Sequence, residues 1–140
     1  MYVVDTNVIS ELRKAAVKKA DINVVKWASS VSASELFVSS ISILELEIGI
    51  LSKQRKDKPQ GDILRAWMDS HVMPAFADRI LAFDANVAKK CARLHIPDPK
   101  SDRDAMIGAT ALLHGMTLVT RDIADFKWMK LSCINPWDEQ

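Results

Sequence analysis

Tyr2-Val3-Val4-Asp5, near the start of the sequence, combines three strand-forming residues with an aspartate directly behind them. Aromatic and β-branched residues favour strands, so this stretch predicts a short strand that ends at Asp5. A second strand-forming run, Thr117-Leu118-Val119-Thr120, is followed two residues later by Asp122. Open parallel sheets bind ligands beyond the carboxyl ends of their strands, so both aspartates are expected at the functional edge.

The segments around these two runs alternate between strand and helix patterns. Further strands are expected over 36–39, 79–83 and 131–134, where hydrophobic residues form short runs. Helices are expected over 21–30, 41–52, 62–71, 85–95 (with Asp84 as N-cap) and 102–114, with a short helical or irregular stretch over 10–19. Pro59 and Gly61 predict a loop over 53–61. Strands that alternate with helices form parallel β-α units, so we predict an α/β fold of three layers, with a central, mainly parallel sheet flanked by helices.

Length and composition favour one compact domain over residues 1–140. The chain is 49% hydrophobic and 26% charged, which is typical of a globular protein with one core. No apolar run is long enough for a membrane span, and the N-terminus lacks the pattern of a secretory signal. Cys91 and Cys133 match no metal-ligand spacing, so we expect reduced thiols and a cytoplasmic location.

Overall charge gives no indication of a nucleic-acid binder, because the formal net charge is only +1. Basic residues do cluster locally on either side of the first predicted helices. Such clusters are commonly solvated loops or helix ends, and they also permit contact with a phosphate backbone. Both interpretations stay open for Arg13, Lys14, Lys18 and Lys19, and for Lys53, Arg55, Lys56 and Lys58.

Glu45 lies in the mostly apolar run from Ile41 to Leu51, early in a predicted helix. Burying a carboxylate costs several kcal/mol unless it has a partner. Its i+4 neighbour is Gly49, which leaves room for a ligand on that face. Ser42 and Glu45 also have the spacing of a capping box, in which the glutamate bonds back to an N-terminal amide. A functional acid and a helix cap therefore remain equal alternatives.

Asp104 lies at the start of the predicted helix over 102–114, and Gly108 and Ala111 follow on the same face. The small residues let this helix pack close to the sheet. An aspartate at a helix start is often only a favourable charge on the helix dipole. Asp102 fits that role as well, or could be a further ligand, and spacing does not decide between Asp102 and Asp104. Arg103, between them, could pair with either acid.

Carboxylates that converge on one pocket raise one another's pKa unless a cation neutralises them. Oxygen ligands without histidine or cysteine select Mg²⁺ or Mn²⁺ over zinc. Such ions activate water and bind phosphate oxygens, so a set of this kind suits hydrolysis of a phosphodiester.

Taken in order, the segments resemble the PIN-domain ribonucleases, especially toxins of the VapC and FitB type. The resemblance covers essentially the whole chain, and the order and spacing of the segments make it specific. It rests on Val4-Asp5-Thr6-Asn7-Val8-Ile9-Ser10, Ser39-Ser40-Ile41-Ser42-Ile43-Leu44-Glu45-Leu46, Asp104-Ala105-Met106-Ile107-Gly108-Ala109-Thr110-Ala111, Thr117-Leu118-Val119-Thr120-Arg121-Asp122 with Phe126, and Asn135-Pro136-Trp137.

The resemblance implies a PIN-like fold and a metal-dependent endoribonuclease that is the toxin of a toxin–antitoxin pair. Asp5 and Asp104 would bind Mg²⁺ or Mn²⁺, while Glu45 and Asp122 would bind directly or through water. Asn7 and Thr120 would be supporting polar groups. The expected partners are RNA, a small DNA-binding antitoxin whose C-terminal segment occupies the groove, and a second copy of the chain in a homodimer or larger assembly.

Three other functions fit the sequence less well. A phosphatase with Asp5 as nucleophile is disfavoured because Asn7 stands where such enzymes have a second aspartate. A phosphate-accepting receiver domain would have a lysine at the end of a late strand, and Thr120-Arg121-Asp122 offers none. A non-catalytic module that binds RNA or a partner gains nothing from a negative pocket.

Overall fold

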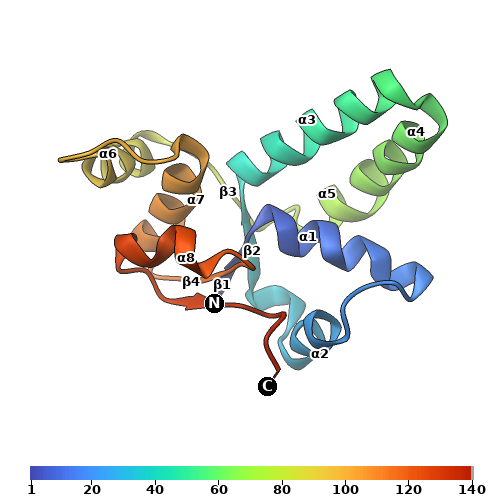
Figure 1. Cartoon of the computed structure of the whole chain (residues 1–140), viewed down its shortest axis with the longest axis horizontal. Helices are drawn as coiled ribbons and strands as arrows, with labels where there is room; N and C mark the ends of the chain where they lie inside the picture. The colour runs from blue at the N-terminus through green and yellow to red at the C-terminus, as the bar shows by residue number, and fades with distance from the viewer. Residues whose placement is uncertain (140) are drawn as a thin grey trace.

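The computed structural model describes residues 1–139 and has a central sheet in which every neighbouring pair of strands is parallel. The strand order is β3-β2-β1-β4-β5, which differs from the 2-1-3-4-5 order of receiver-type folds. The predicted α/β fold with a mainly parallel sheet is confirmed (Figure 1). The strands are β1 (Tyr2–Val4), β2 (Leu36–Ser39), β3 (Ile80–Leu81), β4 (Thr117–Val119) and β5 (Cys133–Ile134).

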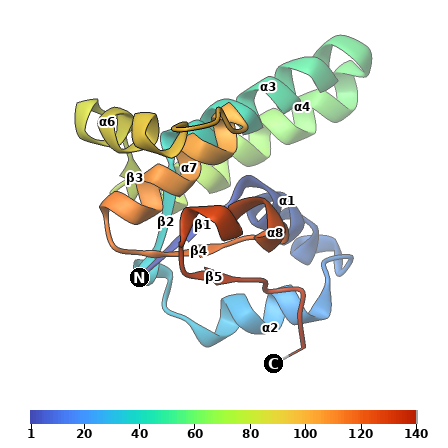
Figure 2. The ribbon, with the colours of Figure 1, turned by 60° about the vertical axis from the view of Figure 1, so that its left-hand side comes forward.

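Helices cover both faces of this sheet, as the two ribbon views show (Figures 1 and 2). Successive residues of a strand point to opposite faces. Val3 and Leu118 therefore belong to one hydrophobic core, while Val4 and Val119 belong to another. The first core includes residues of α6 (Ala85–Leu94), α7 (Asp102–Leu113) and α8 (Ile123–Phe126), and the second includes residues of α1 (Thr6–Arg13), α2 (Ile22–Ser30), α3 (Ser40–Lys56) and α4 (Lys58–Trp67).

The loop predicted over 53–61 is wrong, because α3 and α4 form a helical hairpin with a break only at Asp57. Asp57 accepts a hydrogen bond from the Gln60 amide at 3.3 Å, and Pro59 lies in the first turn of α4, where its missing N–H costs nothing. A Cβ on Gly61 would lie 2.4 Å from Gln54 Cα. The glycine therefore serves close packing of the two helices and does not mark a loop.

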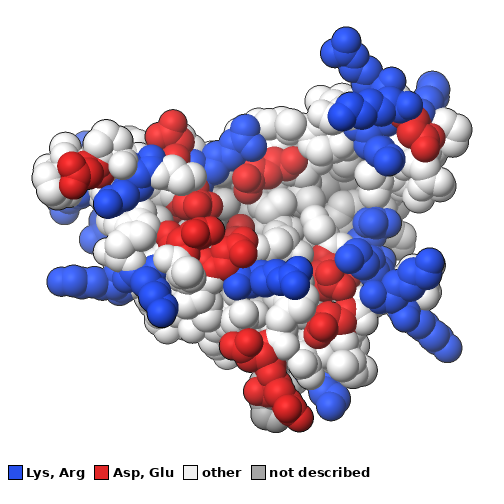
Figure 3. Space-filling view, in the orientation of Figure 1, with Lys and Arg blue, Asp and Glu red and all other residues white. Residues whose placement is uncertain are grey.

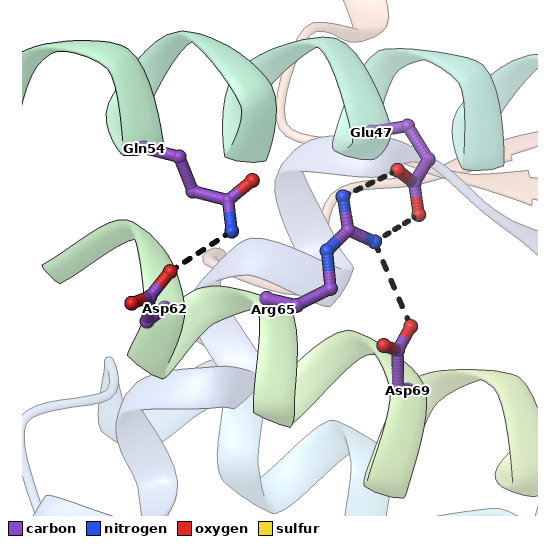
Figure 4. Close-up of polar contacts among 5 residues, drawn as sticks. All are labelled: Glu47, Gln54, Asp62, Arg65 and Asp69. Atoms are coloured by element: carbon purple, nitrogen blue, oxygen red, sulfur yellow. Dashed lines mark hydrogen bonds and ion pairs between the residues drawn. The ribbon is translucent and has the colours of Figure 1, made fainter. Parts of the chain in front are cut away.

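Polar contacts hold the two helices of the hairpin together (Figure 4). Arg65 donates two hydrogen bonds to Glu47, at 2.7 and 2.8 Å, and lies 3.6 Å from a carboxylate oxygen of Asp69. Gln54 donates to Asp62 at 3.1 Å. A bidentate arginine–carboxylate pair fixes orientation as well as distance, so these contacts set how α4 lies along α3.

Several other boundaries differ from those predicted. The first helix begins at Thr6 and not at Ser10, because Asp5 caps it. The helix expected over 62–71 continues past Pro74 through a π-helical turn, η3 (Met68–Val72), into α5 (Met73–Ala75). Strands β3 and β5 are shorter than expected. The expected start of α6 is confirmed, since Asp84 accepts from the Val87 amide at 3.0 Å. The expected C-terminal stop of α7 at Gly115 is confirmed as well, since this glycine has a φ of 63°.

The short 3₁₀ turns η1 (Lys14–Val17), η2 (Ala33–Glu35) and η4 (Lys127–Met129) link the larger elements. Cys91 and Cys133 are free thiols. Among residues 1–139, no helix has the length and apolar character needed to cross a bilayer.

Candidate active site

Asp5 follows β1 directly and is almost fully buried, with 7% of its surface exposed. Its Oδ1 accepts from the Thr6 amide at 2.8 Å, and its Oδ2 accepts from the Thr120 hydroxyl at 2.8 Å. Burial raises the pKa of Asp5 to about 6, helped by the negative charges of Glu45 and Asp104, although the two hydrogen bonds lower it. The carboxyl group is thus held in a fixed orientation in a site that disfavours its charge.

Glu45 approaches Asp5 from α3 and does not cap that helix. The N-cap is Ser39, whose Oγ accepts from the Ile41 amide at 3.0 Å, so the capping-box alternative for Glu45 is wrong. Glu45 Oε1 instead accepts from the Thr6 hydroxyl at 2.7 Å. Its Oε2 lies 3.7 Å from a guanidinium nitrogen of Arg103, on α7. Glu45 therefore connects α3 to both α1 and α7 across the pocket.

The structure separates Asp104 from Asp102, which spacing alone left undecided. Asp104 is half-buried, and its pKa is raised mainly by burial, then by the charges of Asp125, Glu45 and Asp122. The Asp102 side chain is 83% exposed, and its Oδ1 lies 3.9 Å from Nε2 of His95. Asp104 faces the other acids, while Asp102 extends toward the end of α6.

Asp122, Asn7 and Thr120 form one connected group at the ends of β1 and β4. The Thr120 hydroxyl donates to Asp5 and accepts from the Asp122 amide at 3.1 Å. Asn7 donates its side-chain amide to Asp122 Oδ2 at 3.1 Å. The predicted acid Asp122 and the predicted supporting residues Asn7 and Thr120 are therefore brought to the same edge of the sheet as Asp5.

Sequence reasoning missed Thr6 and Asp125 at this site, and it expected Arg103 to pair with Asp102 or Asp104 and not with Glu45. Thr6 positions Glu45, Arg103 pairs with it, and the charge of Asp125 is the first electrostatic cause of the raised pKa of Asp104. Asp125 lies three residues after Asp122, a spacing that puts both on one side of a helical turn, and this could have indicated it. Neither Thr6 nor Arg103 carries a comparable signal, because their contacts join residues that are distant in the sequence.

Acidic side chains gather at the centre of one face of the molecule, with Lys and Arg around them (Figure 3). The acids described above offer only carboxylate oxygens. Burial is the main cause of the raised pKa values of Asp5 and Asp104, and the negative charges of the neighbouring acids add to it. This donor chemistry fits a hard divalent cation. Among residues 1–139, no three acidic, histidine or cysteine side chains are already arranged to hold an ion.

A groove between α1, α3 and α4 leads away from Glu45 and Thr6. Its cavity measures about 290 Å³. The floor is mostly apolar, and Arg13 and Lys53 supply positive charge. A Cβ on Gly49 would touch nothing within 4 Å, which agrees with the expectation that this glycine leaves space beside Glu45. The lining residues are Thr6, Ser10, Arg13, Glu45, Leu46, Gly49, Ile50, Lys53, Leu64 and Trp67.

The fold and the acidic pocket at the carboxyl ends of its strands define an α/β protein suited to binding a divalent cation and a phosphate ester. The PIN domain family model matches residues 2–128, and the chain belongs to that family. It is 35% identical over 143–146 positions to curated relatives, among them the VapC ribonuclease Y4jK of Sinorhizobium fredii, with 99% of each chain covered.

Two further similarities concern the FitB branch of the family. The chain is 31% identical to toxin FitB of Neisseria gonorrhoeae, covering 99% of this chain and 100% of the relative. A solved structure of FitAB bound to the IR36 DNA fragment superposes with a TM-score of 0.86 at 31% identity, covering 100% of this chain and 98% of that chain. The resemblance to PIN-domain toxins inferred from the sequence is confirmed.

Proposed function

We propose that this chain is a metal-dependent endoribonuclease and the toxin of a toxin–antitoxin pair. The observation that supports the proposal most is Asp5, a nearly buried carboxyl whose pKa of about 6 reflects burial and the charges of Glu45 and Asp104. Such a cluster is unfavourable by itself and becomes favourable around a cation. Relatives named as a VapC ribonuclease and a FitB toxin align with this chain over 99% or more of their own length.

In this proposal Asp5 and Asp104 hold Mg²⁺ or Mn²⁺, and Glu45 and Asp122 bind it directly or through water. When bound, the ion supplies positive charge to the scissile phosphate and lowers the pKa of the attacking water. The chain supplies the orientation: the Thr120 hydroxyl fixes Asp5, and the Thr6 hydroxyl fixes Glu45. These hydrogen bonds already restrict the two carboxylates, so less side-chain freedom is lost when the carboxylates bind the ion.

The groove beside Glu45 is the proposed site for an antitoxin. Its apolar floor suits a hydrophobic peptide segment, while Arg13 and Lys53 suit acidic residues on that segment. We propose that the C-terminal part of a small antitoxin lies here and that its other half binds DNA. The solved structure of FitAB bound to the IR36 DNA fragment supports an antitoxin partner and its association with DNA. Co-expression with a neighbouring small reading frame should restore growth, and persistent growth arrest would contradict it.

A homodimer is also proposed, on the basis of the outer face of α3. In the mostly apolar run from Ile41 to Leu51, Leu44, Ile48 and Leu51 are 47%, 40% and 58% exposed. Contiguous exposed apolar residues on a helix are typical of an interface. Light scattering after size exclusion should give twice the mass of the chain, and Ile48→Glu should give the monomer mass.

The first experiment is cleavage of total cellular RNA by the wild type and Asp104→Asn, with Mg²⁺ or Mn²⁺ and with EDTA. Discrete fragments that need both the metal and Asp104 are expected. The matched control is Asp102→Asn, which changes a neighbouring acid that extends away from the pocket. Equal RNA profiles for the wild type, Asp104→Asn and EDTA samples would overturn the nuclease proposal in favour of a binding module.

A further inference from the structure

An acidic pocket that cleaves RNA also repels it, because the RNA backbone carries a negative charge at each phosphate. A fixed cation beside the pocket would offset this repulsion and hold the strand. Arg121 has the right place in the chain, since it lies between Thr120 and Asp122. Thr120 bonds to Asp5, and Asp122 bonds to Asn7, so both neighbours of Arg121 are anchored in the site.

The side chain of Arg121 is held over an aromatic ring. Its Cζ lies 5.1 Å from the centroid of the Trp137 ring, within the range of a cation–π contact. Within residues 1–139 its guanidinium makes no hydrogen bond and no ion pair within 4 Å, and its longer-range attraction to Glu11, on α1, lowers the pKa of that carboxyl only as a minor cause. All five N–H donors are therefore available, in the planar fork that matches phosphate oxygens.

Three asparagines fix the backbone around this arginine and its tryptophan. The Arg121 amide donates to Asn7 at 3.5 Å, and the Arg121 carbonyl accepts from Asn135 at 3.3 Å. Asn135 also accepts from the Trp137 amide at 2.9 Å, and the Trp137 carbonyl accepts from Asn23 at 2.9 Å. The C-terminal segment is thereby tied to α1 and α2, so the guanidinium loses little further freedom when it binds a ligand.

Arg103 borders the same pocket but is already engaged. Its guanidinium lies 3.7 Å from Glu45, so it neutralises an acid of the cluster. Lys100 lies over the Trp128 ring at 5.1 Å, and it has a flexible point charge in place of a planar fork. Arg121 is thus the cation at this edge that combines a fixed position with unused donors.

We infer that Arg121, positioned by Trp137, binds an RNA backbone phosphate next to the one that is cleaved. The inference rests on the proposed nuclease function and names the residue that holds its substrate. Arg121 acts on the strand directly, while Trp137 and Asn135 are positioning residues that act through it.

The test measures RNA binding in the Asp104→Asn background, where the strand stays intact. The probe is a short fluorescein-labelled RNA of mixed sequence, and Kd is measured by anisotropy over a series of KCl concentrations. Arg121→Ala should weaken binding about tenfold, the loss expected for a charge-assisted hydrogen bond. It should also reduce the slope of log affinity against log salt by about 0.7, because one phosphate contact to a single strand is lost.

Two further variants separate the roles of charge and position. Arg121→Lys should retain the salt slope and lose part of the affinity, since it keeps the charge without the fork. Trp137→Leu should weaken binding with the slope unchanged, and Trp137→Phe should restore most of the affinity. The matched control is Arg93→Ala, an exposed arginine of α6 that lies beside Leu113, at the opposite end of α7 from Asp104.

Equal Kd values and salt slopes for Arg121→Ala and Arg93→Ala would overturn the inference. If the wild type cleaves RNA in that case, the proposed function stands and only the role of Arg121 is lost. If the wild type neither cleaves nor binds RNA, both fail together. Thermal unfolding of each variant checks that the fold is retained, and Arg121→Ala changes an exposed side chain.

Discussion

Asp5→Asn should make the protein more stable at neutral pH while it abolishes cleavage. Burial raises the pKa of Asp5 from 3.8 to about 6, so the folded state holds a proton that the unfolded state releases. Both states are protonated below pH 3.8, and no penalty applies there. The penalty grows as the pH rises from 3.8 to 6, and above this range it is fully present.

The size of the effect follows from that shift. A rise of the pKa of Asp5 from 3.8 to about 6 corresponds to a folding penalty of about 3 kcal/mol for the charged form. Asparagine removes the charge and can keep both hydrogen bonds of the carboxyl group. The side-chain carbonyl of the introduced asparagine would still accept from the Thr6 amide, and the Thr120 hydroxyl would accept in place of donating. Asp5→Asn should therefore gain about 3 kcal/mol in unfolding free energy near pH 8 and little near pH 4.

The assay is urea unfolding of the wild type and Asp5→Asn at both pH values, in EDTA so that no cation neutralises the site. Asp84→Asn is the matched control: it changes an exposed N-cap, where asparagine and aspartate cap equally well. If Asp5→Asn is no more stable than the wild type near pH 8, or if the gain is the same near pH 4, the buried charge of Asp5 does not destabilise the fold.

Three other perturbations follow from single contacts. Gly61→Ala should lower the unfolding free energy by about 1–3 kcal/mol, because the new Cβ would lie 2.4 Å from Gln54 Cα. Gly49→Ala has open space around it and should raise the unfolding free energy by up to about 1 kcal/mol. Urea titration of both variants tests the difference. Thr120→Val should move the acidic limb of the pH–rate profile upward, since the hydroxyl lowers the pKa of Asp5, and an unmoved limb would contradict that. Arg65→Met should cost less than about 1 kcal/mol despite two hydrogen bonds to Glu47, because the pair is partly exposed; a loss of several kcal/mol would show a larger role.

Most of the fold could be predicted because short local runs of the sequence determine the strands. Runs such as Tyr2–Val4 and Leu36–Ser39 have one strong preference, and their alternation with helices leaves few topologies. The hairpin of α3 and α4 could not be predicted in the same way. Pro59 and Gly61 usually mark loops, and only the position of Gln54 on the facing helix shows that Gly61 is there for close packing.

Some residues of the candidate site could likewise be predicted from local sequence, and others depended on contacts between distant segments. Asp5 and Asp122 lie just beyond the carboxyl ends of β1 and β4, where the topology of a parallel sheet places ligands, so sequence position alone indicated them. The choice between Asp102 and Asp104 needed the direction of each side chain. Glu45 needed the Thr6 hydroxyl, a contact across 39 positions, before its helix-cap alternative could be rejected.

Under the proposed function, the two arginines at the pocket would offset an electrostatic conflict that the acids create. The same charges that would attract a divalent cation repel the RNA phosphate that the cation must reach. Arg103 pairs with Glu45 and so weakens the repulsion within the cluster in the absence of a cation. Arg121 instead keeps its donors unused and is held by Trp137. If both assignments hold, Arg103→Ala should strengthen Mn²⁺ binding measured by calorimetry, because a competing cation is removed, while Arg121→Ala leaves it unchanged. Weaker Mn²⁺ binding by Arg103→Ala would mean that Arg103 orients Glu45 for the ion and does not compete with it.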